Sequence, residues 1–220
     1  RILRGKDGQV EKGGLFSFPD GDRDSKQWGH IKLAERIINP VFEKPASLLL
    51  GIPVSKFERV LSGKVEIGGK TGMSAIVKGL KEINLEQRIS ELEGSVKGLR
   101  KTERDIAYKQ IKLLKALRKN NISPYEAYTM KYMPVLPPKM RPISLSAEVG
   151  ALGDVEMDDI NQLYKHVGMA NDLVKSLPKE ALPEDKDEIT YKMYDKVRNA
   201  FIEGALDNKG APINSLLQAT

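Results

Sequence analysis

The chain of 220 residues contains no cysteine, which excludes disulfide bonds, cysteine-ligated zinc and thiol catalysis. It has only two histidines, His30 and His166, which are too far apart in the sequence to form a metal site without carboxylate ligands. No uncharged stretch approaches the roughly 20 apolar residues of a membrane-spanning helix. A secretory hydrophobic segment is also missing and the first residue is Arg1, so we expect an internal piece of a cytoplasmic polypeptide.

Aromatic residues are scarce at 6%, whereas hydrophobic residues make up 40% of the chain and charged residues 30%. This composition favours a mainly helical chain with a few short strands, an α+β fold, over a β-sandwich. The length corresponds to one large domain or two small ones.

Basic residues outnumber acidic residues by 36 to 30, which gives a net charge of +6. The excess is concentrated between residues 97 and 119, where only Glu103 and Asp105 are acidic. The basic residues of this run are Lys97, Arg100, Lys101, Arg104, Lys109, Lys112, Lys115, Arg118 and Lys119. The run has two interpretations: a surface that binds nucleic-acid phosphates, or a solvated helix face.

Secondary structure in the first half follows from side-chain alternation and from proline and glycine. Alternating side chains from His30 to Ala34 predict a strand, which Pro40 interrupts. Pro53 is expected to begin a short amphipathic helix, and Gly63 to end it as a C-cap. Two or three helices are predicted between about residues 71 and 121. The apolar face of the last one consists of Ile106, Ala107, Ile111, Leu113, Leu114 and Leu117.

The second half begins with a proline-rich segment, residues 133–143 (MPVLPPKMRPI), which cannot continue a helix because proline lacks the backbone donor. Residues 144–154 are small and nearly uncharged, which predicts a mobile loop. Two amphipathic segments follow, on either side of a tip bounded by Pro178 and Pro183. They can bury their apolar faces only by folding back on each other, so we predict a projecting antiparallel helical hairpin.

Two motifs approach known ligand sites without matching them. Gly63 and Gly69 are separated by five residues, one more than in a phosphate-binding P-loop, so we expect a plain turn. Residues 19–24 (PDGDRD) have aspartates at alternate positions, but Ile31 stands where an EF-hand requires glutamate, so a solvated acidic turn is favoured. We expect His30 to be structural and His166 to be solvent-exposed. The sequence therefore predicts neither a catalytic residue nor a metal ligand in this chain.

The order of the segments is more informative than any single motif. GHIKLAERIINPVF, LLLGIPVSKFERVL, SAIVKGLKEINLEQRISELE, KQIKLLKALRKN, MPVLPPKMRPI, DDINQLYKHVGMANDLVK and FIEGALDNKG follow one another along the chain. This order resembles the N-terminal clamp region of the beta-prime subunit of multisubunit DNA-directed RNA polymerase. The resemblance extends from about Gly13 to the C-terminus, and PVLPPKMRP is its most specific part.

The resemblance divides the chain into five segments. Residues 1–70 correspond to an N-terminal clamp segment, and 71–143 to a basic helical unit with the proline-rich segment. Residues 144–157 correspond to the lid, which separates the transcript from the template strand, and 158–206 to the clamp helices, on which a sigma-type initiation factor docks. Residues 207–220 resemble the start of the rudder, beside the RNA–DNA hybrid.

The resemblance also implies site residues, all of them outside catalysis. Nucleic-acid contacts are expected from Lys139, Arg141, Arg100, Lys101, Arg104 and Lys109. Val149 and Leu152 are expected in the lid. Contacts to the initiation factor are expected from Asn161, Lys165, Asn171, Asp172, Glu188 and Lys192.

Three departures from the family pattern sharpen these expectations. The four-cysteine zinc module between the segments GLF and GHI is replaced by a short cysteine-free loop, so we expect no zinc. Ala170 and Leu173 stand where bacterial members have arginines that engage sigma, which suggests a divergent sigma-like partner. The family's magnesium-binding aspartate motif is absent, so the Mg²⁺ of an assembled polymerase would be bound elsewhere and this chain would need no cofactor.

The resulting hypothesis is a non-catalytic part of a nucleotidyl-transferring enzyme that holds DNA and the RNA–DNA hybrid and docks an initiation factor. Its partners would be a beta-like subunit, the rest of beta-prime, the factor, and nucleic acid, with no membrane. A compact, zinc-less form resembles the split polymerases of large bacteriophages, which would place it in the host cytoplasm; a fragment of a divergent cellular enzyme is the alternative. The rival function is a free-standing basic helical adaptor outside any polymerase.

Overall fold

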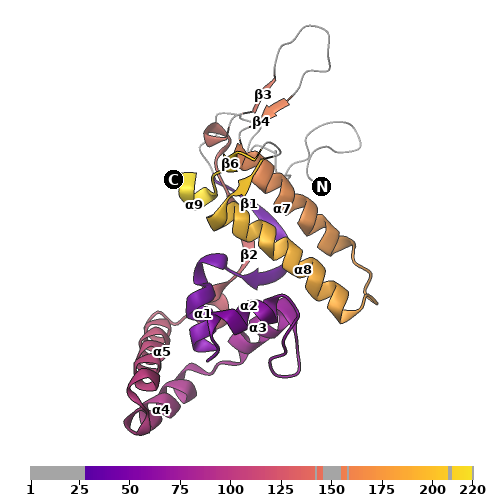
Figure 1. Cartoon of the computed structure of the whole chain (residues 1–220). Helices are drawn as coiled ribbons and strands as arrows, with labels where there is room; N and C mark the ends of the chain where they lie inside the picture. The colour runs from indigo at the N-terminus through magenta and orange to yellow at the C-terminus, as the bar shows by residue number, and fades with distance from the viewer. Residues whose placement is uncertain (1–27, 142, 146–154, 158, 208–209, 220) are drawn as a thin grey trace. The chain divides into compact units, whose positions relative to one another are not determined.

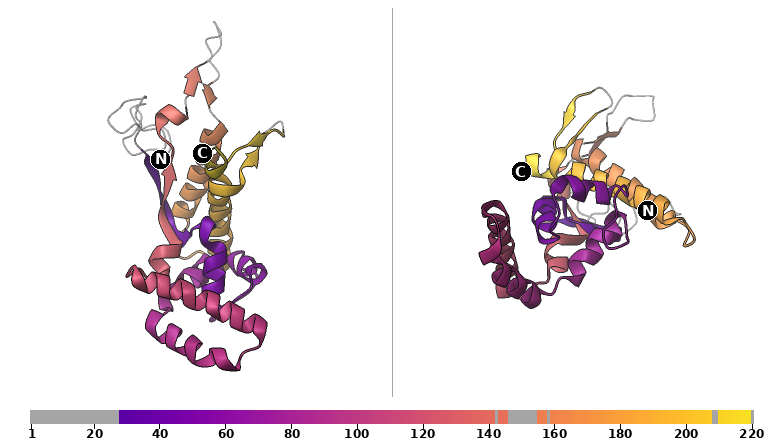
Figure 2. Two further views of the ribbon diagram at one scale, coloured as in Figure 1. Left: turned by 90° about the vertical axis from the view of Figure 1, so that its left-hand side faces the viewer. Right: turned by 60° about the horizontal axis from the view of Figure 1, so that its bottom comes forward.

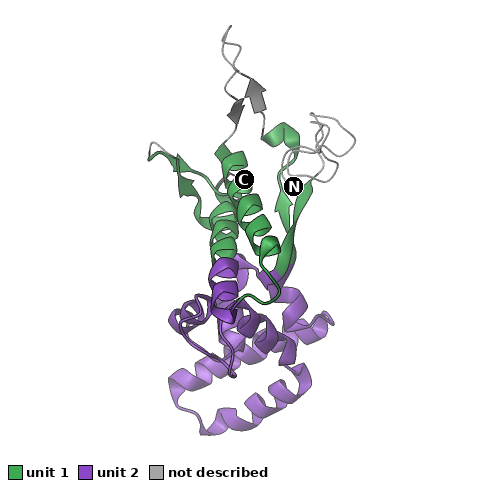
Figure 3. Ribbon diagram, turned by 90° about the vertical axis from the view of Figure 1, so that its right-hand side faces the viewer, with its two compact units in different colours: residues 1–35, 131–181, 192–220 green, residues 36–130, 182–191 purple. Residues whose placement is uncertain are grey.

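The structure is a computed structural model that describes residues 28–141, 143–145, 155–157, 159–207 and 210–219. It confirms the expected α+β class, with mostly helical residues and short antiparallel strands (Figure 1). The chain forms two compact units (Figure 3). Unit 1 consists of residues 1–35, 131–181 and 192–220, and unit 2 of residues 36–130 and 182–191.

Unit 2 is a helical body. Its helices are α1 (Glu43–Leu49), α2 (Val54–Leu61), α3 (Gly72–Glu82), α4 (Leu85–Ser95), α5 (Lys101–Lys119) and α6 (Pro124–Tyr128), with short 3₁₀ turns at Pro40–Phe42 and Val96–Gly98. Phe57, Ile76, Leu80 and Leu114 are almost fully buried and form the centre of its core. At the start of α8, Asp187 accepts a hydrogen bond from the Thr71 hydroxyl, which ties residues 182–191 to the N-terminus of α3.

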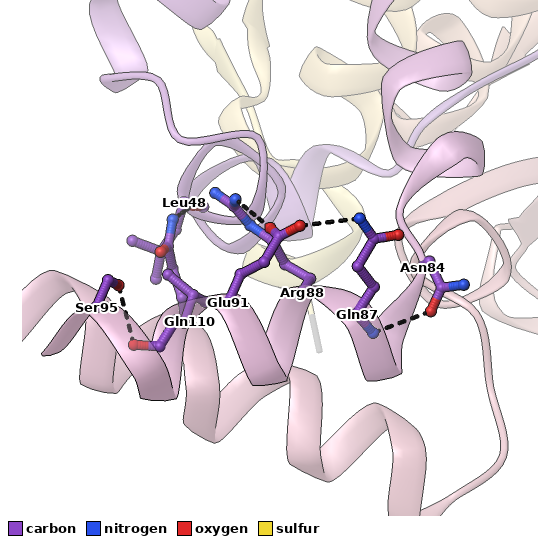
Figure 4. Close-up of polar contacts among 8 residues, drawn as sticks. Leu48, Asn84, Gln87, Arg88, Glu91, Ser95 and Gln110 are labelled. Carbon is purple, nitrogen blue, oxygen red and sulfur yellow. Dashed lines mark hydrogen bonds and ion pairs between the residues drawn. The ribbon is translucent and has the colours of Figure 1, made fainter.

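The α4 and α5 helices lie side by side within unit 2, as both views in Figure 2 show. Ion pairs join them, from Lys115 to Glu93 at 2.7 Å and from Arg118 to Glu86 at 3.1 Å. The buried Gln110 side chain of α5 donates to the Leu48 carbonyl and so fastens the helix to α1 (Figure 4).

The α4 helix begins with a side-chain cap that the same close-up shows. The Asn84 side chain accepts from the Gln87 amide at 3.2 Å, which satisfies one of the free donors of the first turn. Further along, Glu91 accepts from both Gln87 and Arg88 (Figure 4). These local contacts define where α4 starts and keep its outer face polar.

Unit 1 combines two longer helices with strand pairs. The helices are α7 (Asp159–Ser176), the second half of α8 (Pro183–Arg198), which continues into a π-helical turn at Asn199–Glu203, and the short α9 (Leu216–Ala219). The strands β1 (Gly29–Ile38) and β2 (Thr129–Val135) pair with each other, and most of their residues, 29–35 and 131–135, belong to unit 1. The strands β3 (Ile143–Leu145) and β4 (Val155–Met157) form a second antiparallel pair, and β5 (Ala205–Leu206) and β6 (Pro212–Ile213) a third.

Most predicted elements of the first half are present. The strand expected from His30 is β1, and the helix expected after Pro53 is α2, with Gly63 in the left-handed conformation at φ 76°. The helices expected between residues 71 and 121 are α3, α4 and α5. One residue of the predicted α5 core is misplaced: Ile106 is 50% exposed, because the buried face is centred on Ala107, Gln110 and Leu114.

The two predicted helices of the second half are α7 and α8. Within unit 1, α7 and the following part of α8 lie side by side (Figures 1 and 3). Leu163, Tyr164 and Val167 of α7 are buried, as are Met193 and Val197 of α8, so both apolar faces are removed from water.

Candidate nucleic-acid interface

The proline-rich segment is attached to α7 by a buried polar network. Leu136 and Pro138 are buried, and a 3₁₀ turn at Pro138–Met140 leads to Arg141, which is only 4% exposed. Arg141 Nε donates to the Leu136 carbonyl at 2.8 Å, and Nη1 donates to Oδ1 of Asn161 at 3.0 Å. The Asn161 side chain returns a hydrogen bond to the Arg141 carbonyl at 3.2 Å. The network therefore joins the segment to the first turn of α7.

Tyr164 completes this network one turn further along α7. Its hydroxyl accepts from the Leu136 amide at 3.2 Å. Burial raises the pKa of Tyr164, although the Leu136 hydrogen bond and the nearby Arg141 charge oppose the change. Burial likewise lowers the pKa of Arg141, but an arginine starts so high that the guanidinium stays charged at neutral pH.

The structure corrects the expectation that Arg141 faces nucleic acid. Its guanidinium is buried and donates to protein acceptors, so it serves as an anchor of the proline-rich segment. Lys139, two residues earlier, is exposed, as a phosphate contact requires. Of the two basic residues in this short segment, Lys139 is therefore exposed to solvent and Arg141 is buried in the protein.

The four basic candidates of unit 2 belong to α5 and the residue before it. Arg100, Lys101, Arg104 and Lys109 are all exposed. Lys115 and Arg118, by contrast, are paired with glutamates of α4. The outer face of α5 thus presents its N-terminal cations to solvent, with the half-exposed Tyr108 ring among them.

The docking candidates on α7 and α8 divide into exposed and buried residues. Lys165, Glu188 and Lys192 are exposed, and Asp172 is half-buried with a salt bridge to Lys175 at 3.0 Å. Asn161 and Asn171 are 0% and 2% exposed, so the expectation that they contact a factor is corrected.

Asn171 has a structural task instead. Its side chain accepts from the Ala34 amide and donates to the Lys32 carbonyl at 3.0 Å, the donor and acceptor that an adjacent strand would use on β1. The signal for this was present in the sequence, because Asn171 falls in helical register with the apolar residues Tyr164, Val167 and Val174. A polar residue on a buried face requires a hydrogen-bond partner.

An apolar patch on the outer surface of α7 was not among the features expected from the sequence. Met169 is 57% exposed and Leu173 is 49% exposed, and their spacing of four residues places them on one face of the helix. Ala170, beside them, is half-buried.

The remaining candidates are a lid, a histidine and metal ligands. Val149 and Leu152 lie outside the described residues, but the flanking β3 and β4 pair in the register Ile143 to Met157.

His166 is exposed, and partial burial together with Lys196 and Lys165 lowers its pKa. The described residues contain no cluster of three or more potential metal ligands, and none of the described helices is long and apolar enough to cross a membrane. The acidic motif at residues 19–24 lies outside the described part.

No family model matches the chain. It is similar to DNA-directed RNA polymerase subunit beta′ of Acinetobacter baylyi, with 34% identity over 120 residues, which are 54% of this chain and 8% of that subunit. Its similarity to the same subunit of Shewanella denitrificans is 31% over 121 residues, or 54% of this chain and 8% of the relative. For the Thermus thermophilus subunit it is 28% over 152 residues, or 68% of this chain and 9% of the relative. The chain thus spans less than a tenth of the length of these relatives.

Proposed function

We propose that the chain is a non-catalytic, N-terminal part of a beta-prime-like subunit of a DNA-directed RNA polymerase. In that role it would help to hold DNA and the RNA–DNA hybrid and would dock a sigma-like initiation factor. The observation on which this proposal depends is the similarity to beta′ subunits, which reaches 152 residues of this chain. Phosphoryl chemistry and its Mg²⁺ would belong to other parts of such an assembly, in the cytoplasm of a bacterium or of a phage-infected host.

The holding function is proposed for exposed cations on ordered supports. Lys139 follows Pro137 and Pro138, both buried, and precedes the anchored Arg141, so its backbone is held on both sides. Arg100, Lys101 and Arg104 occupy the start of a 19-residue helix. Such cations bind phosphates without sequence preference and release counterions, which makes the binding weaken with salt.

The docking function is proposed for the outer surface of α7. Met169 and Leu173 offer an apolar contact, and Lys165 and Asp172 lie near them on the same helix. Apolar side chains that lose water at an interface contribute more than charges at its rim. The partner surface would accordingly be apolar at its centre, which agrees with a factor that does not depend on arginine contacts.

The test is recovery of the assembly from native cells through an affinity tag on this chain. We expect polypeptides similar to beta and to the remainder of beta-prime, together with an initiation factor, identified by mass spectrometry. Recovery of the chain alone, or with unrelated proteins only, would favour the free-standing adaptor and contradict the polymerase role.

A matched pair of variants tests the docking surface. Leu173→Asp should weaken retention of the initiation factor at least tenfold, as removal of a central apolar side chain does. Leu217→Asp in α9 is the control, because Leu217 is 52% exposed outside the proposed surface. Equal factor retention by both variants would remove α7 from the docking site.

A further inference from the structure

Three aromatic residues of unit 1 are exposed at or beside β1 and β2. Trp28, immediately before β1, is 54% exposed, and Tyr132 of β2 is 52% exposed. His30 is also exposed, and its ring meets the Tyr132 ring edge to face, with centroids 5.2 Å apart and an interplanar angle of 83°. We call Trp28, His30, Tyr132 and the exposed Lys32 the aromatic face.

The pleat explains why these side chains share a side. Side chains alternate along a strand, so positions 30 and 32 of β1 point away from positions 29, 31 and 33. Trp28 directly precedes the strand, and the same alternation would place it with His30. Leu33 is 1% exposed, and a Cβ added to Gly29 would lie 3.7 Å from Cβ of the buried Val135. The inner side of the strand pair is therefore core, and the aromatic face is the outer side.

Trp28 and Tyr132 each leave about half of their surface exposed to water. Exposed aromatic groups that lie close together on a surface often mark binding sites, because a partner can remove their rings from water. The two segments around the aromatic face, residues 28–35 and 131–141, contain the exposed lysines Lys32 and Lys139 and a single acidic residue, Glu35. Flat rings among cations are the combination that single-stranded nucleic acids bind, since bases stack on rings and phosphates approach lysines.

We propose that the aromatic face stacks the bases of a single-stranded nucleic acid, with Trp28 and Tyr132 as platforms and Lys32 as a phosphate contact. Duplexes bind poorly to such a face, because their bases are already stacked and paired. The inference deepens the proposed function. It rests on that function only for the identity of the bound strand, because a polymerase exposes single strands of both transcript and DNA. The binding chemistry itself stands on the described side chains.

Trp28 is the single tryptophan of the chain, so intrinsic fluorescence reports on this face directly. Titration of the 220-residue chain with oligo(rU), oligo(dT) and a duplex of equal length should quench Trp28 with the single strands and far less with the duplex. The two single-stranded probes distinguish a transcript site from a DNA site. The proposal would be overturned if neither single strand quenched Trp28, or if the duplex quenched it as strongly as the single strands.

Variants assign the binding to the rings. Tyr132→Ala should weaken single-strand binding roughly 5- to 150-fold, the range for loss of one stacked base, whereas Tyr132→Phe keeps the ring and should bind as the parent does. Lys32→Ala should lower the slope of log affinity against log salt by about 0.7, the value for one phosphate of a single strand. Wild-type affinity for Tyr132→Ala would show that Tyr132 is not a platform.

The same measurements separate this inference from the proposed function. Single-strand binding by a chain that recovers no polymerase subunits would keep the aromatic face and remove the polymerase role. Recovery of the subunits without oligonucleotide quenching, but with a Trp28 change when the subunits are added, would show that the face contacts protein and would overturn the inference alone.

Discussion

Two basic regions of this molecule differ in what surrounds their cations. Around the proline-rich segment of unit 1, Arg141 is enclosed by Leu136, Asn161 and Tyr164 while Lys139 remains exposed. On α5 of unit 2, basic side chains at the start of the helix are exposed, and Lys115 and Arg118 further along pair with glutamates of α4. Residue type alone therefore does not identify a nucleic-acid contact. The position of each cation relative to the local core decides between anchor and contact.

The largest expected effect is that of Arg141→Ala. The change leaves the Leu136 carbonyl and the Asn161 side chain buried without their donors, and hydrogen bonds from a charged group are the stronger ones. We expect the free energy of unfolding to fall by about 3 kcal/mol, measured by urea denaturation. Arg141→Lys keeps the charge but lacks the planar guanidinium, so its free energy of unfolding should lie between those of the parent and Arg141→Ala. A stability loss below that of a surface substitution would contradict the anchor role.

Asn171→Ala should rank second. It removes both the acceptor for the Ala34 amide and the donor to the Lys32 carbonyl, so the open edge of β1 loses its substitute partner. We expect a loss of about 2 kcal/mol in the free energy of unfolding and faster hydrogen exchange of the Ala34 amide. Lys165→Ala, at an exposed position of the same helix, is the control and should stay within about 0.5 kcal/mol of the parent.

The exposed cations should behave in the opposite way. Lys139→Ala, and Lys101→Ala combined with Arg104→Ala, should each change stability by less than about 0.5 kcal/mol. Each should nevertheless weaken nucleic-acid binding by the assembled complex and lower the salt slope by roughly 0.9 for every duplex phosphate that is no longer neutralised. If the Lys101→Ala, Arg104→Ala double variant left the salt dependence of nucleic-acid binding unchanged, the exposed face of α5 would be a solvated surface. Lys139 would then be the remaining candidate for a phosphate contact.

The smallest expected effect concerns His166. Partial burial, Lys196 and Lys165 lower its pKa from 6.5, so the unfolded chain takes up a proton at higher pH than the folded chain. Protonation of His166 therefore lowers the free energy of unfolding, and this loss appears as the pH falls through 6.5. His166→Gln should reduce the loss of urea midpoint between about pH 7.5 and about pH 5.5, and Lys196→Met should reduce it less. The same pH dependence in His166→Gln as in the parent would assign it to other groups.

Periodicity was sufficient to predict the longer helices and the first strand. The apolar faces predicted α2, α5, α7 and α8, and the alternation after His30 predicted β1, because these patterns follow directly from helix and strand geometry. β2 was missed because Pro134 interrupts its pattern. Proline is tolerated there because a two-stranded sheet consists only of edge strands. The strands of the pairs β3–β4 and β5–β6 are only two or three residues long, too short for side-chain alternation to be recognised in the sequence.

The candidate site was harder to predict, since side-chain burial depends on tertiary contacts. Lys139 and the cations at the start of α5 are exposed, and their expected contacts with nucleic acid stay predictions. Arg141, Asn161 and Asn171 were expected at the surface because the family resemblance implied contacts to nucleic acid or to an initiation factor there, and the structure buries all three side chains with protein partners. Only the helical register of the two asparagines could have indicated this.

The division of the chain between its units has a consequence for biosynthesis. Residues 182–191 belong to unit 2, yet residues 131–181 of unit 1 separate them from the rest of that unit. Unit 2 therefore cannot be complete until residue 191 has left the ribosome, although its other helices, α1 to α6, are synthesised well before that point. A nascent chain arrested at residue 150 should show Thr71 without its Asp187 partner and should be cleaved more readily near α3 than the finished protein. Vectorial synthesis thus delays the closure of unit 2 until the second half of the chain has been made.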